Sequence, residues 1–306
     1  MNQMKPGYLR LHESGELSRR IEAARNILKD CTLCPWHCHV DRPAGDKGVC
    51  RVGALPMVSS YGAHFGEERP LVGNNGSGTI FLSFCNLKCV FCQNYDISHL
   101  GEGREMQVEE LGEIMVSLWR QGCHNINFVS PSHQVAQILE ALPYAIERGL
   151  DIPLVYNCGG YDELATLFLL DGVFDIYMPD FKYGDSQTAL RLSAIPHYFE
   201  TAKEALKEVH RQVGDLVLDE RGIALRGLLV RHLVLPEGLA GTREVMNFIA
   251  REISPATYVN IMDQYRPCFE AIGNVPLNRR ITAAEFDEAV AVARQHGISR
   301  LDGITV

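Results

Sequence analysis

The chain has 306 residues, which is enough for one large α/β domain and a smaller appendage. Apolar residues make up 46% and charged residues 22%, as in ordinary globular proteins, and a formal net charge of −9 argues against a broad basic surface for nucleic acid. No apolar run reaches the roughly 18 residues that span a bilayer, and the first residues lack the apolar core of a secretory signal. We therefore expect a cytoplasmic protein with neither nucleic acid nor membrane as a partner. In that reducing compartment its ten cysteines are expected to be metal ligands rather than members of disulfides.

The first part of the chain is rich in cysteine. Residues 13–29 carry apolar side chains at helical spacing, which predicts a first helix. The turn-rich stretch after it contains Cys31, Cys34, Cys38 and Cys50. Four thiolates can close a structural zinc site or hold an iron–sulfur cluster, and ligand softness does not choose between these metals. Reduced thiols without a metal are the third interpretation.

The remainder of the chain alternates between two kinds of segment. Alternation of strands and helices predicts parallel strands joined by crossover helices, and six units rather than eight predict an α/β fold of the partial (β/α)6, TIM-like barrel type. We assign residues 1–75 to an N-terminal helix and Cys-rich extension, residues 76–306 to the barrel, and an inserted hairpin to residues 216–225. The predicted strands are 79–84, 125–130, 152–157, 173–178, 228–235 and 257–262, and the predicted helices are 107–121, 132–148, 161–170, 187–213, 242–252 and 282–296.

Three further cysteines, Cys85, Cys89 and Cys92, follow the first of these strands with the spacing C-x3-C-x2-C. Iron–sulfur clusters are usually held by four thiolates, so three thiolates leave one iron without a protein ligand. An open metal position is the mark of a reactive site, because a closed coordination shell leaves no place for substrate. A zinc site completed by His99 or by a distant cysteine is the alternative.

Polar residues follow the other predicted strands. Ligands of such barrels bind at the C-terminal ends of the strands, so we expect these side chains to surround one site. The serines offer acceptors for an ammonium group, although Ser132 also suits a helix N-cap. Asp180 and Lys182 lie two apart and therefore point the same way, either into the barrel mouth or as a surface ion pair. On the fifth strand Arg231 and His232 point to opposite faces, so only one of them faces the lumen. The candidate cofactor-binding residues are Ser130, Ser132, Asn157, Asp180, Lys182 and His232.

The cysteine loop carries a family resemblance. Its sequence, Phe84-Cys85-Asn86-Leu87-x-Cys89-x2-Cys92-Gln93-Asn94, resembles the radical S-adenosylmethionine (radical SAM) superfamily. Together with Cys-x2-Cys-Pro-x2-Cys from residue 31, and with the strings at 210–214, 231–236 and 262–265, the chain resembles an uncharacterised branch related to the pyruvate formate-lyase activating enzyme.

The resemblance implies a 4Fe–4S cluster on Cys85, Cys89 and Cys92 whose open iron binds the amino and carboxylate groups of S-adenosylmethionine. Reductive cleavage would give methionine and a 5′-deoxyadenosyl radical that abstracts hydrogen from a substrate. Activating enzymes of that branch take the hydrogen from a glycine Cα of a partner protein or peptide, and a flavodoxin- or ferredoxin-like protein supplies the electron. No catalytic side chain is implied beyond the ligands of the cluster and of S-adenosylmethionine.

The sequence departs from the family pattern in two places. Val129-Ser130-Pro131-Ser132-His133 stands where many radical SAM enzymes have Gly-Gly-Glu. The additional cysteines precede the barrel, whereas some activating enzymes insert theirs after the cluster motif. A non-catalytic iron–sulfur or zinc-binding scaffold, or a cluster carrier, is therefore the alternative function.

Overall fold

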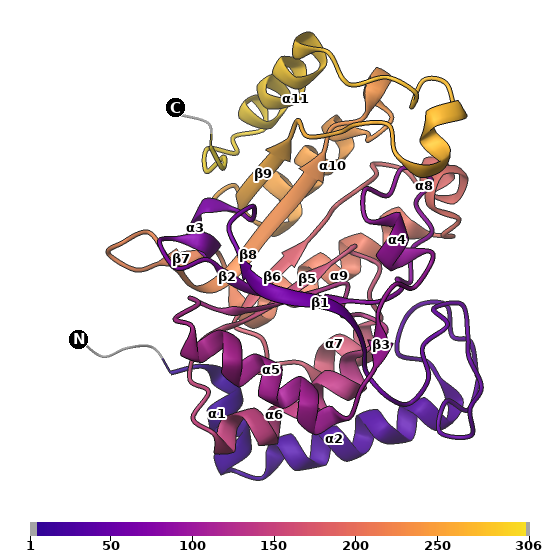
Figure 1. The fold of residues 1–306 in the computed structure, drawn as a ribbon. Coiled ribbons are helices and arrows are strands. Elements are labelled where there is room, and N and C mark those ends of the chain that lie inside the picture. Colours follow the sequence, from indigo (N-terminus) through magenta and orange to yellow (C-terminus); the bar gives the residue numbers. More distant parts are fainter. Residues whose placement is uncertain (1–4, 304–306) are drawn as a thin grey trace.

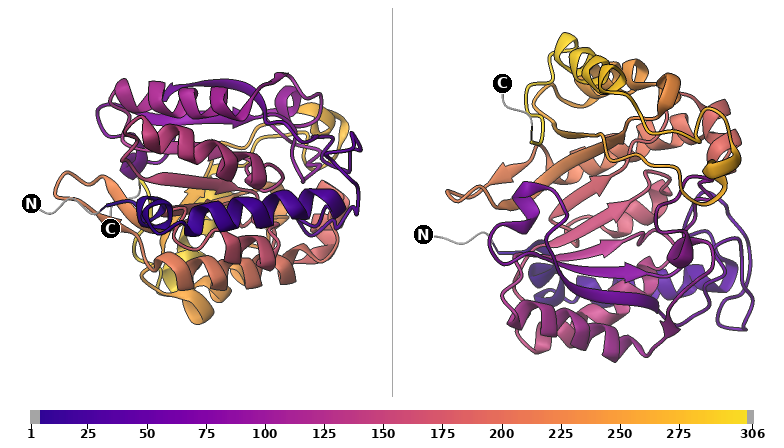
Figure 2. Two further views of the ribbon diagram at one scale, coloured as in Figure 1. Left: turned by 90° about the horizontal axis from the view of Figure 1, so that it is seen from below. Right: turned by 45° about the horizontal axis from the view of Figure 1, so that its top comes forward.

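The structure is a computed structural model and describes residues 5–303. One mixed sheet forms its centre, with the strand order β3-β1-β2-β4-β5-β6-β8-β7 and with β9 beside β8. The sheet curves into an open barrel with most of the helices on its outer side (Figures 1 and 2). Its strands are β1 (Met57–His64), β2 (Ser77–Leu82), β3 (Arg104–Glu105), β4 (Ile126–Val129), β5 (Leu154–Cys158), β6 (Ile176–Pro179), β7 (Val217–Leu218), β8 (Ala224–Leu233) and β9 (Tyr258–Met262).

The six predicted strands form the parallel part of the sheet. β2, β4, β5, β6, β8 and β9 pair in parallel in this order, so the predicted α/β fold with a partial TIM-like barrel is confirmed. The helices are α1 (Gly7–Glu13), α2 (Glu16–Ile27), α3 (Arg69–Val72), α4 (Tyr95–Ser98), α5 (Val108–Arg120), α6 (Val135–Glu147), α7 (Leu164–Leu169), α8 (Ser186–Ser193), α9 (Tyr198–Val213), α10 (Thr242–Phe248) and α11 (Ala283–Gln295). Short 3₁₀ segments lie at Leu28–Asp30, Pro236–Gly238 and Phe269–Gly273, and a π-helical turn at Ile249–Ile253 continues α10.

One predicted helix is shorter than expected and another is broken. The helix predicted at residues 13–29 is α2, which begins after Gly15, where a φ of 75° is tolerated by glycine without strain, and α1 ends at Glu13, where the predicted range begins. The segment 187–213 is split into α8 and α9, because Ala194 and His197 adopt positive φ and Pro196 between them cannot continue a helix. The predicted hairpin exists, but its second arm is the beginning of β8 itself rather than a separate strand.

The cysteine-rich extension contributes to the sheet. β1 lies before residue 76 and pairs antiparallel with β2. After β1, the chain passes through α3 beside the sheet (Figure 1). Leu71 on α3 belongs to a buried cluster with Val155, Ile176 and Leu229 of three parallel strands. Gly66 and Glu67 of the same segment line the cavity that also contains the three cysteines. The division of the chain at residue 75 stays a prediction.

Among residues 5–303, no helix combines the length and the apolar character that crossing a bilayer requires.

Candidate functional site

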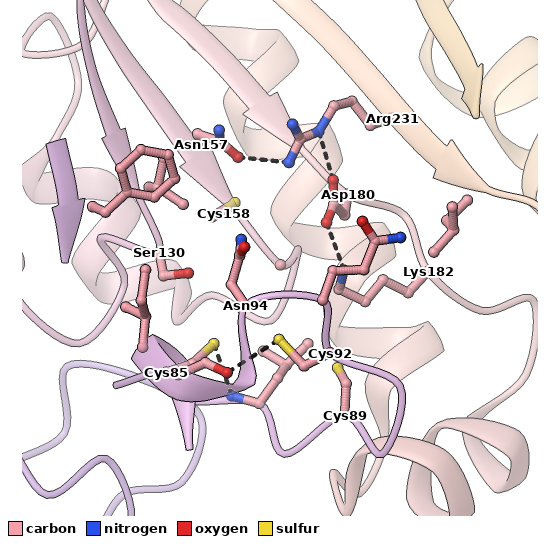
Figure 3. Close-up of a pocket in the computed structure, with 18 of the residues that line it drawn as sticks. Cys85, Cys89, Cys92, Asn94, Ser130, Asn157, Cys158, Asp180, Lys182 and Arg231 are labelled. Atoms are coloured by element: carbon pink, nitrogen blue, oxygen red, sulfur yellow. Dashed lines mark hydrogen bonds and ion pairs between the residues drawn. The ribbon is translucent and has the colours of Figure 1, made fainter. Parts of the chain in front are cut away.

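A cavity of about 350 Å³ lies at the C-terminal ends of the parallel strands. The thiols of Cys85, Cys89 and Cys92 line one side of it, and the polar ends of β5, β6 and β8 line the other (Figure 3). Parallel strands place their carboxyl ends at the same edge, which is why residues far apart in sequence meet here. The cavity therefore combines the three-cysteine loop with most of the polar residues predicted from the strand ends.

The backbone is strained where two strands enter this cavity. Phe84, directly before the first cysteine, has a φ of 64°, and Ser130, directly after β4, has a φ of 59°. Non-glycine residues in this left-handed region cost about 1–3 kcal/mol, and such strain concentrates at binding and catalytic sites. The two turns direct the cysteine loop and the Ser130 hydroxyl toward the same space.

Each of the three thiols has a polar neighbour. Ser193 Oγ donates to Cys89 Sγ at 2.9 Å, the backbone N–H of Leu87 donates to Cys85 Sγ at 3.4 Å, and Cys92 Sγ lies 3.1 Å from Ser98 Oγ. Burial raises the pKa of Cys89 to about 12 and also raises the pKa of Cys85. Both thiols therefore stay protonated without a cation, and a bound metal would replace their protons.

The three thiols do not surround one point. Among residues 5–303, no three His, Cys, Asp or Glu side chains gather in the way that a single metal ion requires. Ligands of one zinc ion, each about 2.3 Å from the metal, lie close together. Thiolates on three corners of a cluster bind three different irons and lie farther apart. The arrangement is thus more compatible with a cluster than with a zinc ion at Cys85, Cys89 and Cys92.

The opposite wall is a network of buried charges. Arg231 donates through Nε to Asp180 Oδ1 at 2.7 Å and through Nη2 to Asn157 Oδ1 at 2.7 Å, and Lys182 Nζ donates to Asp180 Oδ2 at 2.5 Å (Figure 3). Burial alone would raise the pKa of Asp180, but Arg231 and Lys182 outweigh it and lower this pKa. Asp180 is therefore ionised between two cations at the rim of the same cavity as the thiols.

Two carboxylates from outside the strand ends complete this network. Glu67 and Glu68 precede α3, and Arg231 lies 3.4 Å from Glu67 Oε2 and 3.9 Å from Glu68 Oε1. Burial raises the pKa of Glu67 to about 7, against the attraction of Arg231. The strand-end rule missed these residues, because they follow an antiparallel strand of the extension. Their sequence carries no signal beyond two adjacent acids before Arg69-Pro70.

The predicted cofactor-binding residues divide into two groups. Ser130, Asn157, Asp180 and Lys182 line the cavity. The fifth-strand residue that faces it is Arg231, and His232 points outward, where its ring nitrogens lie 2.7 Å from Phe181 O and 2.9 Å from Thr242 Oγ1. Arg231 therefore replaces His232 as the candidate on this strand.

Ser132 lies outside the cavity as well. It is 2% exposed and packs beside Asp162 and Tyr156, because the turn after Ser130 directs the chain behind the sheet. Burial lowers the pKa of the next residue, His133, to about 3, so that this histidine is neutral, and its Nε2 lies 2.9 Å from Ser83 O. Ser130 is thus the candidate that remains after β4.

Six parallel strands form a half barrel whose mouth carries three thiols with the spacing C-x3-C-x2-C, and such thiols are ligands of iron–sulfur clusters. The family model of the radical SAM superfamily matches residues 79–220. Uncharacterized protein MJ0674 of Methanocaldococcus jannaschii is 34% identical over 292 residues, which cover 92% of this chain and 79% of that protein. The chain belongs to the radical SAM superfamily, whose members use a 4Fe–4S cluster together with S-adenosylmethionine.

Solved structures with a similar fold are more distant. HydG, a maturase of the [FeFe]-hydrogenase, is 13% identical with a TM-score of 0.49, and the match covers 73% of this chain and 49% of that one. SuiB of Streptococcus suis, bound to its precursor peptide SuiA, is 12% identical with a TM-score of 0.47, and the match covers 71% and 46%. The chain thus spans about half the length of these two proteins.

The residues of the cavity fit such a cofactor pair. Three thiols with polar neighbours face the cavity, and they are too dispersed for a single ion. Acceptor oxygens of Ser130 and Asn157 and the cations Lys182 and Arg231 line the same space, so that both an ammonium and a carboxylate group would find partners.

A variant of the neighbour of Cys89 tests the assignment of the cluster ligands. Ser193→Ala removes the hydroxyl that donates to Cys89 Sγ, and it leaves the Tyr183 hydroxyl, 2.5 Å from Ser193 Oγ, without this partner. Loss of a group that orients a metal ligand typically costs about 10–100-fold in metal affinity. We expect iron to be lost to a chelator about 10-fold more readily than from the wild type. Ser117→Ala, on the exposed face of α5, is the control, and equal iron retention in the two variants would contradict the assignment.

The raised pKa of Glu67 makes stability depend on pH. This carboxyl has a pKa of about 7 in the folded chain and an ordinary value of 4.5, so the folded state binds more protons between these values and loses stability as pH rises through them. Glu67→Gln removes the charge and hence this loss, so we expect the variant to exceed the wild type in unfolding free energy at pH 8, but not at pH 4.5, by about 1–3 kcal/mol. Denaturant unfolding at both pH values measures the difference, with the exposed Glu113→Gln as control. An equal difference at the two pH values would show that folding does not raise the pKa of Glu67.

Proposed function

We propose that the chain binds a 4Fe–4S cluster through Cys85, Cys89 and Cys92 and cleaves S-adenosylmethionine reductively in the adjoining cavity. When bound, the cluster and S-adenosylmethionine supply a 5′-deoxyadenosyl radical that abstracts a hydrogen atom from a substrate. The observation that carries this proposal is the meeting, in one cavity, of the C-x3-C-x2-C thiols with a buried network of charged side chains.

The residues opposite the thiols would orient S-adenosylmethionine. Ser130 Oγ and Asn157 Oδ1 offer acceptors for its ammonium group, in place of the Gly-Gly-Glu that this chain lacks. Lys182 and Arg231 offer cations for its carboxylate, while Asp180 holds both of them toward the cavity. The buried ion pairs keep these side chains in one arrangement before the cofactor arrives, which reduces the cost of ordering them.

For the substrate we propose a glycine Cα in a partner protein or peptide, with the electron delivered by a flavodoxin- or ferredoxin-like protein. The support is the likeness of the sequence to activating enzymes, including the Asp180-x-Lys182 pair, which lines the cavity. This proposal predicts the fate of a hydrogen atom. A glycine-containing peptide deuterated at Cα should yield deuterated 5′-deoxyadenosine, whereas undeuterated product from every such peptide would point to another substrate class.

The test of the reaction itself needs no knowledge of the substrate. The protein is reconstituted anaerobically with iron and sulfide and is then reduced in the presence of S-adenosylmethionine. We expect 5′-deoxyadenosine and methionine in equal amounts, well above the amounts from unreconstituted protein. A loaded cluster that passes to an acceptor protein without any 5′-deoxyadenosine would instead identify a cluster carrier.

A further inference from the structure

The coil between the first helices and β1 is a second concentration of cysteine, apart from the cavity. Residues 31–56 contain neither helix nor strand, yet their backbone is fixed by defined contacts. Cys31 N donates to Val40 O at 3.1 Å, and His39 N donates to Cys31 O at 3.1 Å. His37, His39 and Arg51 adopt positive φ, which non-glycine residues do at a cost. A segment with so little regular structure needs another source of order.

The four thiols of this coil lie near one another. Cys31, Cys34 and Cys50 are 3–5% exposed, and Cys38 is half-buried. Cys34 lies near enough to the other three to interact with each of them electrostatically. Gly48 permits the close passage of the coil, because a Cβ there would approach Cys38 Sγ to 2.7 Å. All four are free thiols in the structure.

The coil surrounds these sulfurs with hydrogen-bond donors. Val49 N donates to Cys38 Sγ at 3.4 Å, and the amides two residues after Cys34 and Cys50 donate to those thiols in turn. The same arrangement, an amide two residues ahead of a sulfur, occurs at Cys85 in the cavity, where Leu87 donates to Sγ at 3.4 Å. Donors aimed at sulfur favour the thiolate, which is the form that ligates metals.

A buried arginine adds a positive charge to the hydrogen-bond donors around these sulfurs. Arg42 is 2% exposed and donates through Nη2 to Cys50 Sγ at 3.3 Å. Its Nη1 donates to His133 O at 2.8 Å. Buried charges are costly unless they are paired, and the nearest sulfur carries a negative charge only as a thiolate. The arginine therefore matches a set of thiolates better than a set of neutral thiols.

We propose that Cys31, Cys34, Cys38 and Cys50 bind a second metal centre, separate from the cluster of Cys85, Cys89 and Cys92. Among residues 5–303 no three ligating side chains converge as one metal ion requires, so these four thiols, like those of the cavity, fit the corners of an iron–sulfur cluster better than a single zinc ion. The amide donors and Arg42 offset part of the negative charge of four thiolates around the metal. The centre would order the coil in place of a hydrophobic core.

The coil also donates a hydrogen bond to the cysteine loop of the cavity. Trp36 Nε1 donates to Asn86 O at 2.7 Å, one residue after Cys85, and Asn86 Nδ2 donates to Tyr161 O at 2.7 Å. Trp36 lies between Cys34 and Cys38 in sequence, so an ordered coil fixes its ring. Loss of the second metal should therefore loosen the loop that carries the first cluster.

Metal analysis of a variant without the cavity thiols tests the proposal. The triple variant Cys85→Ala, Cys89→Ala, Cys92→Ala is purified anaerobically and also reconstituted with iron and sulfide. We expect about four irons per chain to remain bound after desalting, as a cluster requires, whereas one zinc per chain would overturn the assignment of a cluster. Absence of bound metal, or disulfides among the four cysteines in a non-reducing peptide map, would overturn the proposal.

Two further variants in the same background assign the metal to its ligands. Adding Cys34→Ser and Cys50→Ser should remove the residual metal, whereas Cys123→Ser, at a buried thiol outside both groups, should retain it. If the first of these variants fails to fold, a mercurial reagent titrated into the folded triple variant should release the metal as four thiols react. Release that tracks the other three cysteines instead would also overturn the proposal.

Discussion

Replacing Cys89 with alanine is expected to abolish the cleavage of S-adenosylmethionine, with product falling to the level of a sample without enzyme. Cys89 is the most buried of the three cavity thiols and lies opposite Lys182 and Asp180. With only two thiolates of the loop left, the cluster loses one of its three ligands. The measurement is 5′-deoxyadenosine formed per chain after anaerobic reconstitution.

A matched variant separates loss of a ligand from loss of the fold. Cys158→Ala removes another buried thiol that lines the same cavity but stands outside the C-x3-C-x2-C loop. It should keep its iron and most of its activity. Circular dichroism should show both variants folded. Cleavage retained in Cys89→Ala would contradict the assignment of this loop as the cluster site.

Replacing Arg231 with methionine is expected to cause the largest loss of stability, about 3–5 kcal/mol of unfolding free energy. Arg231 lies among Asp180, Glu67 and Glu68, and its side chain is only 17% exposed. Removing it leaves buried carboxylates without their main partner, so that they must take up protons or remain uncompensated. Urea unfolding at pH 7 measures the change.

Two comparisons interpret that result. Arg221→Met breaks an ion pair with Asp219 on an arginine that is 75% exposed, and such surface pairs contribute less than about 1 kcal/mol. Combining Arg231→Met with Glu67→Gln should restore part of the lost stability, because the second change removes a buried carboxylate that Arg231 had paired, whereas Asp180 keeps Lys182. Equal effects of Arg231→Met and Arg221→Met would mean that the charge network is solvated rather than buried.

The parallel strands could be predicted from the sequence, because each is a short apolar run and the helices between them have their own period. The positions of β1 and α3 of the N-terminal extension could not be predicted in this way. β1 and α3 lie in a segment with several glycines and no clear period, yet β1 joins the sheet and Leu71 joins a buried cluster with three of its strands. β1 pairs with β2, which lies further along the chain, and Leu71 packs with residues more than 80 positions away, and local patterns encode neither contact.

The same distinction holds for the candidate site. The C-x3-C-x2-C spacing and the strand-end rule brought out the three thiols, Ser130 and Asn157, all of which line the cavity. The rule assigns a strand end but not a face, so it could not choose between Arg231 and His232. Neighbouring residues on a strand point to opposite faces of the sheet. Only the pairing of the strands in the structure shows that Arg231, beside Asp180, points inward.

The central claim is that one iron of a cluster at the mouth of this barrel lacks a protein ligand and is free to bind S-adenosylmethionine. Electron paramagnetic resonance of the reconstituted and reduced protein tests it most directly, with and without added S-adenosylmethionine, in the wild type and in the Cys34→Ser, Cys50→Ser variant to separate the two metal sites. We predict a 4Fe–4S signal that changes in shape when S-adenosylmethionine is added. A signal unaltered by S-adenosylmethionine, or no 4Fe–4S signal at all, would contradict the account.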